Sequence, residues 1–217
     1  MTFVLVHGAA DRAASWDEVA AALRGRGHDV VAVDLPCEDD GAGFGDYADV
    51  VAEAVGDRGD LVLVGHSLGG YTAALLAERL PTRMLVLVTA MVPRPGETPM
   101  EFWANTGHRF GSDDVVETYL ADATPEQAER ALALGRDQSG TPMGEPFPLE
   151  AWPDVPTRYL ACTRDNFNPV EWTRAMVRDR LGIEADEIDA GHCPYITRAD
   201  ELAQRLHDYA RKAAPPA

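Results

Sequence analysis

The sequence predicts an α/β fold in which a mostly parallel sheet is flanked by helices. Short, continuously apolar runs alternate with segments of helical periodicity along most of the chain. A continuously apolar run is typical of a strand covered on both faces, and strands that alternate with helices form parallel sheets through right-handed crossovers. One apolar run also passes directly into the next helix through a serine between two glycines, at residues 65–69. A turn of this kind belongs at the carboxyl end of a buried strand.

The predicted strands share an apolar run that ends at a polar or glycine-containing turn. They cover residues 3–6, 28–34, 61–66, 84–89, 158–162 and 187–190.

The predicted helices carry apolar residues at a spacing of three and four. The first begins at Ser15, where Ser-Trp-Asp-Glu has the form of a capping box, and Val19, Ala22 and Leu23 then share one face. Thr197 is expected to cap the last helix, which runs to about residue 209. The other predicted helices cover residues 47–54, 71–80 and 169–180.

Composition and charge limit the partners of the chain. The formal net charge of −17 argues against nucleic acid and anionic membrane surfaces, because both require basic patches. The cysteines at 37, 162 and 193 lack disulfide or metal-binding spacing, so we expect reduced thiols. No charged leader precedes an apolar segment, which predicts a cytoplasmic protein without a membrane span. A homodimer is compatible with the sequence. We expect residues 213–217, at the end of the chain, to be frayed.

Ser67 is the candidate nucleophile. The apolar strand, the sequence Gly-His-Ser-Leu-Gly at residues 65–69 and the helix that follows together form a nucleophile elbow. Glycines suit this turn because the strained backbone brings neighbouring chain too close for side chains. The alternative is a glycine-rich turn without chemistry.

A serine hydroxyl needs a base, and in this architecture the chain order is serine, acid, histidine. His192 follows a predicted strand in a glycine-containing loop, whereas His108 lies between residues 91 and 152 and His207 lies inside the last helix. We therefore predict His192 as the base. The alternative is a structural loop histidine.

Asp165 is the predicted acid, since it follows the strand at 158–162 and active residues gather at the carboxyl ends of parallel strands. Asp154 precedes that strand, and Asp186 and Asp189 are too close to His192 in sequence to reach its ring. The alternative for Asp165 is a cap on the turn that follows it.

Backbone N–H groups are expected to bind the oxyanion of an acyl-transfer reaction. Leu68 begins the elbow helix, and Ala9 lies in the loop after the first strand. His7 either borders this oxyanion site or is structural. His66 either polarises the elbow or packs beneath it, and Cys193 is expected to be a small buried residue.

The alternation of strands and helices stops between residues 91 and 152, where prolines, aromatic residues and methionines gather. We predict a lid inserted into a single domain of residues 1–217. A lid of this composition forms an apolar pocket for an acyl or alcohol group. The candidate pocket residues are Met91 and Trp103, with Asn105 and His108 as polar candidates.

The chain resembles the α/β-hydrolase fold superfamily. The opening Phe-Val-Leu-Val-His-Gly-Ala, Trp16, Gly-His-Ser-Leu-Gly-Gly, the acid in Cys-Thr-Arg-Asp and the late Gly-His resemble its compact methylesterase and hydroxynitrile lyase branch. The resemblance implies about six strands. Those lyases generally have Glu before the nucleophile and Lys after the catalytic histidine, whereas this chain has His66 and Cys193, so an esterase is favoured.

These observations predict cleavage of a small or medium, mostly apolar carboxylic ester through an acyl-enzyme on Ser67. The mechanism requires neither a metal nor an organic cofactor. The same triad is also compatible with thioester, lactone or carbon–carbon bond cleavage. A third interpretation is a ligand-sensing receptor of this fold with vestigial turnover.

Overall fold

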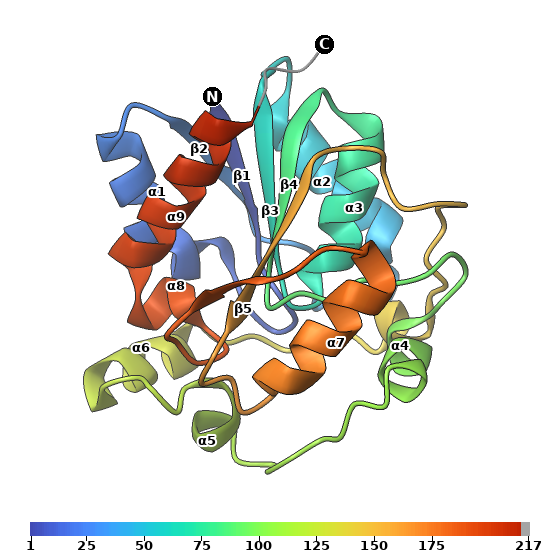
Figure 1. Cartoon of the computed structure of the whole chain (residues 1–217), viewed down its shortest axis with the longest axis vertical. Coiled ribbons are helices and arrows are strands. Elements are labelled where there is room, and N and C mark those ends of the chain that lie inside the picture. The colour runs from blue at the N-terminus through green and yellow to red at the C-terminus, as the bar shows by residue number, and fades with distance from the viewer. Residues whose placement is uncertain (214–217) are drawn as a thin grey trace.

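The computed structural model describes residues 1–213 and contains a six-stranded sheet in the order β2-β1-β3-β4-β5-β6 (Figure 1). Every pairing is parallel. The strands are β1 (Thr2–Val6), β2 (Asp29–Ala32), β3 (Leu61–His66), β4 (Thr82–Val88), β5 (Thr157–Cys162) and β6 (Asp186–Ile188). The α/β fold with about six strands is therefore confirmed. The predicted fraying concerns residues that, apart from Ala213, lie outside the described part of the chain.

Helices cover both faces of the sheet, as Figure 1 shows. On one face, α1 (Asp17–Gly25) and α9 (Ala199–Lys212) pack on a core that includes Phe3 and Leu5. On the other face lie α2 (Phe44–Val55), α3 (Gly69–Arg79) and α7 (Val170–Leu181), in a core that includes Val4 and Val6. Successive side chains of β1 thus enter opposite cores, which is why the strand is continuously apolar.

The register of the central strands brings several loop starts to one edge of the sheet. His66 of β3 is paired with Val88 of β4, and Val88 is paired with Leu160 of β5. The residues that follow these strands, including Ser67 and Thr89, therefore emerge side by side at the carboxyl edge. This is where parallel sheets place their active groups.

Between β4 and β5 the described chain forms no strand and contains four short helical segments. These are α4 (Pro99–Asn105), α5 (Val115–Tyr119), α6 (Pro125–Leu134) and the 3-10 turn η2 (Thr141–Gly144). Thr98 and Thr124 begin α4 and α6 as capping boxes with proline in the first turn. Figure 1 shows α4, α5 and α6 at the end of the molecule to which the strands point.

The predicted start of the first helix is wrong. Ser15 lies inside a 3-10 turn, η1 (Ala13–Trp16), and Trp16 is the residue that precedes α1. The Ser15 hydroxyl donates to Asp11 instead of capping the helix.

The predicted cap of the last helix is also wrong. Thr197 ends a short helix that the sequence did not reveal, α8 (Pro194–Thr197), and Arg198 precedes α9 without a side-chain cap. Pro194 in the first turn favours this extra helix directly after the His192 loop. Among the described helices, none has the length and apolarity required to cross a membrane.

Candidate active site

Ser67 sits on a sharp turn between β3 and α3. Its φ is 50°, in the left-handed region that a serine rarely adopts. A Cβ on Gly65 would lie 2.8 Å from the Ala73 Cβ, and a Cβ on Gly69 would lie 2.5 Å from the His7 carbonyl oxygen. Glycine is therefore required at both positions, and the turn leaves Ser67 lining a cavity.

His192 and Asp165 form a buried hydrogen-bonded pair. The His192 Nδ1–H donates to Asp165 Oδ2 at 2.8 Å, and their side chains are 3% and 0% exposed. The backbone N–H groups of Phe167 and Asn168 each donate to Asp165 Oδ1 at 2.8 Å. Burial acts to raise the pKa of Asp165, but the nearby His192 and the hydrogen bonds outweigh it and hold that pKa below its usual value. Asp165 therefore stays ionised beside His192.

Thr89 is a site residue that sequence reasoning missed. Its hydroxyl donates to Asp165 Oδ2 at 2.6 Å, and its carbonyl accepts from Asn168 Nδ2 at 3.1 Å. Its φ of 40° is again in the left-handed region. The sequence holds one signal for it, a polar residue that follows an apolar strand at the carboxyl edge.

His66 packs directly beneath His192. Its Nε2–H donates to the His192 backbone carbonyl at 2.9 Å, and its ring lies against Tyr195 at 4.8 Å between centroids. Among residues 1–213, its Nδ1 has no hydrogen-bond partner. Burial first, and then the proximity of His192, lower the pKa of His66 to about 3. The ring is thus neutral and supports the backbone of the His192 loop.

This lowered pKa makes stability depend on pH. The unfolded histidine titrates near 6.5, so the stabilising contribution of the neutral ring is complete above that pH and is lost as pH falls from 6.5 towards about 3. Between pH 7 and pH 5 we expect the free energy of unfolding to fall by about 2 kcal/mol more in the wild type than in His66→Gln. Urea unfolding of both proteins at the two pH values measures this difference. Because His7 and Asp165 are present in both, an equal loss would show that His66 does not titrate in this way.

A cavity of about 790 Å³ joins the carboxyl edge of the sheet to the segment between β4 and β5. Ser67 and His192 line it together with Ala9 and Leu68, and neither of the latter two N–H groups donates to another backbone carbonyl of residues 1–213. The apolar wall is formed by side chains that include Met91, Trp103, Tyr119, Leu120 and Phe167.

Asn105 and His108 do not line this cavity, which corrects the prediction that they give polar specificity. Asn105 Nδ2 donates to Glu97, a buried carboxylate that is also paired with Arg180. The His108 Nε2–H donates to the Phe167 carbonyl at 2.7 Å, and its ring packs 4.4 Å from that of Trp103. His108 therefore supports two residues of the cavity wall, Phe167 and Trp103, whereas Asn105 belongs to the buried Glu97–Arg180 ion pair.

The polar wall contains three side chains that sequence reasoning missed, Asp11, Arg136 and Tyr195. The Tyr195 hydroxyl donates to Asp11 Oδ2 at 2.8 Å across 184 residues of sequence. Arg136 Nη2 donates to the carbonyls of Asp11 and Leu35 at 2.8 and 3.0 Å. No local pattern links residues this far apart, so only the tertiary structure reveals them.

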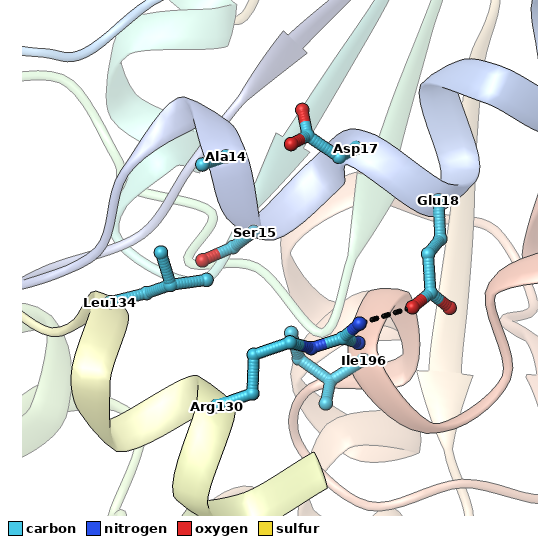
Figure 2. Close-up of a pocket in the computed structure, with 7 residues that line it drawn as sticks. All are labelled: Ala14, Ser15, Asp17, Glu18, Arg130, Leu134 and Ile196. Carbon is cyan, nitrogen blue, oxygen red and sulfur yellow. Dashed lines mark hydrogen bonds and ion pairs between the residues drawn. The ribbon is translucent and has the colours of Figure 1, made fainter.

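A smaller hollow of about 190 Å³ lies between η1 and α6 (Figure 2). The Arg130 guanidinium and the Glu18 carboxylate form an ion pair across it. Its serine, Ser15, donates to Asp11 and has no base beside it among the lining residues. The cavity at Ser67 is therefore the candidate active site.

The arrangement of an elbow serine, a histidine on a late loop and an acid after a strand matches a known family. A model of the alpha/beta hydrolase family matches residues 3–205. The chain belongs to this family. The predicted resemblance to the superfamily and its methylesterase branch is confirmed.

Among curated relatives of this alpha/beta hydrolase, a pyrethroid hydrolase of Sphingobium wenxiniae is 28% identical over 95% of this chain and 86% of the relative. Methylesterase 7 of Arabidopsis thaliana is 29% identical, and the match covers 98% of this chain and 97% of the methylesterase. Among solved structures, a pyrethroid hydrolase from Sphingobium faniae superimposes with a TM-score of 0.78 at 25% identity, covering 98% of both chains.

Proposed function

We propose that this alpha/beta hydrolase cleaves small or medium, mostly apolar carboxylic esters through an acyl-enzyme on Ser67. The observation that carries the proposal is the buried hydrogen bond between Asp165 and His192, a histidine that lines the same cavity as the elbow serine Ser67. The pyrethroid hydrolase and methylesterase names of its relatives support ester cleavage.

In the proposed mechanism His192 serves first as base and then as acid. Its Nδ1–H is engaged by Asp165, so Nε2 carries the free lone pair that accepts the Ser67 proton during attack on the ester carbonyl. The imidazolium, stabilised by Asp165, then protonates the leaving alcohol. His192 next activates a water that hydrolyses the acyl-enzyme and restores Ser67.

The backbone N–H groups of Ala9 and Leu68 are the proposed oxyanion donors. Both residues line the cavity beside Ser67. Each donor is worth about 3 kcal/mol when it is aimed at the position that the oxyanion occupies in the tetrahedral intermediate.

The apolar wall favours substrates with an apolar acyl or alcohol group, which would pack against it. We assign residues 91–152 the role of a lid within one hydrolase domain, since Trp103, Tyr119 and Leu120 from this segment line the cavity. A cytoplasmic location is also part of the proposal, and the free thiols of the cysteines at 37, 162 and 193 support a reducing compartment.

A panel of p-nitrophenyl esters of rising acyl length, run beside methyl esters of aromatic acids, tests the function. We expect many turnovers per enzyme molecule on at least one ester. A single slow event followed by a stable conformational change would instead identify a ligand sensor, and cleavage confined to thioesters or lactones would reassign the substrate.

Trp103 allows the acyl pocket to be tested against simple packing. We expect Trp103→Phe to change the ratio of kcat/KM between long and short acyl esters by about 10-fold or more, because one lost apolar contact is worth roughly 1–3 kcal/mol of selectivity. Trp172→Phe is the matched control, since its ring lies 6.2 Å from that of Trp103 but does not line the cavity. A uniform loss on all esters in both variants would show that Trp103 only packs the core.

A further inference from the structure

His7 directly follows β1, at the start of the loop that carries Ala9, and its side chain is completely buried. Both ring nitrogens are engaged. Nδ1 lies 2.8 Å from the Gly8 carbonyl oxygen, and Nε2 lies 3.0 Å from the Leu35 backbone nitrogen. The proposed mechanism does not use this histidine, yet both of its ring nitrogens have hydrogen-bond partners.

The partners of His7 determine which nitrogen carries the proton. The Leu35 N–H and the Arg136 Nη2–H, 3.4 Å away, both donate to Nε2, so Nε2 is the acceptor. The proton of the neutral ring is then on Nδ1, which donates to the Gly8 carbonyl. Burial first, and also the charge of Arg136, lower the pKa of His7 and keep the ring neutral.

The Gly8 carbonyl and the Ala9 N–H belong to the same peptide unit. This unit is planar and trans, so its C=O and N–H point in opposite directions. A hydrogen bond that holds the carbonyl therefore also fixes the direction of the N–H, and it polarises the peptide so that the N–H becomes a stronger donor.

The same peptide lies against the nucleophile. A Cβ on Gly8 would be 3.0 Å from the Ser67 Cβ, and Ala9 lines the cavity. On the far side of the loop, the Ala10 N–H donates to Gln138 Oε1 at 3.2 Å, so the following peptide is held as well.

We propose that His7 is a positioning residue for oxyanion stabilisation, in which its Nδ1–H holds the Gly8–Ala9 peptide so that the Ala9 N–H faces the reacting carbonyl. This role rests on the proposed function. It predicts an effect on the transition state rather than on substrate binding, because the oxyanion exists only after Ser67 attacks.

Two amide substitutions separate the two hydrogen bonds of His7. His7→Asn places an amide N–H near the position of Nδ1, where it still reaches the Gly8 carbonyl. His7→Gln places an amide oxygen near the position of Nε2, where it accepts from Leu35 but leaves Gly8 without its donor. The variants are otherwise matched, since both are neutral amides in the same buried site.

We expect His7→Gln to lower kcat about 10- to 100-fold with little change in KM, since misaligning one oxyanion donor costs less than the 100- to 1,000-fold loss from removing it. His7→Asn should recover most of this loss. A trifluoromethyl ketone that matches the best ester forms an oxyanion on Ser67, so its Ki should rise in His7→Gln as kcat/KM falls. The corresponding secondary alcohol, which binds without forming an oxyanion, should keep its Ki.

Wild-type kcat in His7→Gln would overturn the proposal, as would equal losses in both variants with parallel changes in both Ki values. If neither variant folds, ¹⁵N-imidazole NMR of the wild type tests the proposal. The proposed role requires the Nδ1–H tautomer of His7, and an Nε2–H tautomer would refute it. Ser67→Ala distinguishes a failure of the proposed function from a failure of the role proposed for His7. Activity retained in that variant would refute the proposed function, whereas a normal His7→Gln together with an inactive Ser67→Ala would refute only the role of His7.

Discussion

Replacing Ser67 with alanine is expected to lower kcat on the best ester by about 10⁴-fold or more, because the hydroxyl is the only proposed nucleophile beside a base. His192→Ala should cost nearly as much. The double variant should be no slower than either single one, since a nucleophile and its base act as a unit and their losses do not add. Steady-state kinetics on all three proteins, with melting curves to confirm that they fold, measures these effects.

A double variant markedly slower than both single variants would contradict the assignment, because it would mean that Ser67 and His192 act independently. Substantial activity in Ser67→Ala would show that another residue of the cavity is the nucleophile.

The second large effect is expected at the acid. Asp165→Asn keeps the shape of the side chain, but its amide favours the wrong tautomer of His192 and cannot stabilise the imidazolium. We expect a loss of roughly a thousandfold or more in kcat. The two backbone N–H groups that donate to Asp165 Oδ1 still find an acceptor in the amide oxygen, so the fold should persist.

Asp154→Asn is the matched control for this substitution. Asp154 is exposed and precedes β5, whereas Asp165 follows it. We expect kcat to change little in the control. The reverse ranking would place the acid at the opposite end of β5.

The sequence was most informative where structure is set by local geometry. β3 spans the predicted residues because every side chain in it is buried, and a strand buried on both faces shows no polar alternation. The elbow was equally clear, since its glycine–serine–glycine pattern directly follows an apolar strand and precedes a helix. The contacts that require glycine are local at Gly65, whereas Gly69 lies against the carbonyl oxygens of Val6 and His7. The candidates Ser67, Asp165 and His192 followed from chain order and strand ends, and their catalytic roles stay predictions that the variants above test.

The hydrogen-bond partners of several polar side chains were missed. The Ser15 hydroxyl fits a capping box in sequence, but Asp11 competes for it in the folded loop. Asn105 and His108 are polar residues in an apolar segment, which suggested a pocket role, yet they bond to Glu97 and to the Phe167 carbonyl. Sequence reasoning cannot rank such partners, because each pairing depends on the path that the folded backbone takes.

Trapping the acyl-enzyme tests the central claim most directly. The enzyme is mixed with a p-nitrophenyl ester, quenched in acid within the first turnovers and digested for mass spectrometry. We expect the mass of the acyl group on the peptide that contains Ser67 and no adduct on the same peptide from Ser67→Ala. An adduct on another residue, or one that persists in Ser67→Ala, would contradict the account.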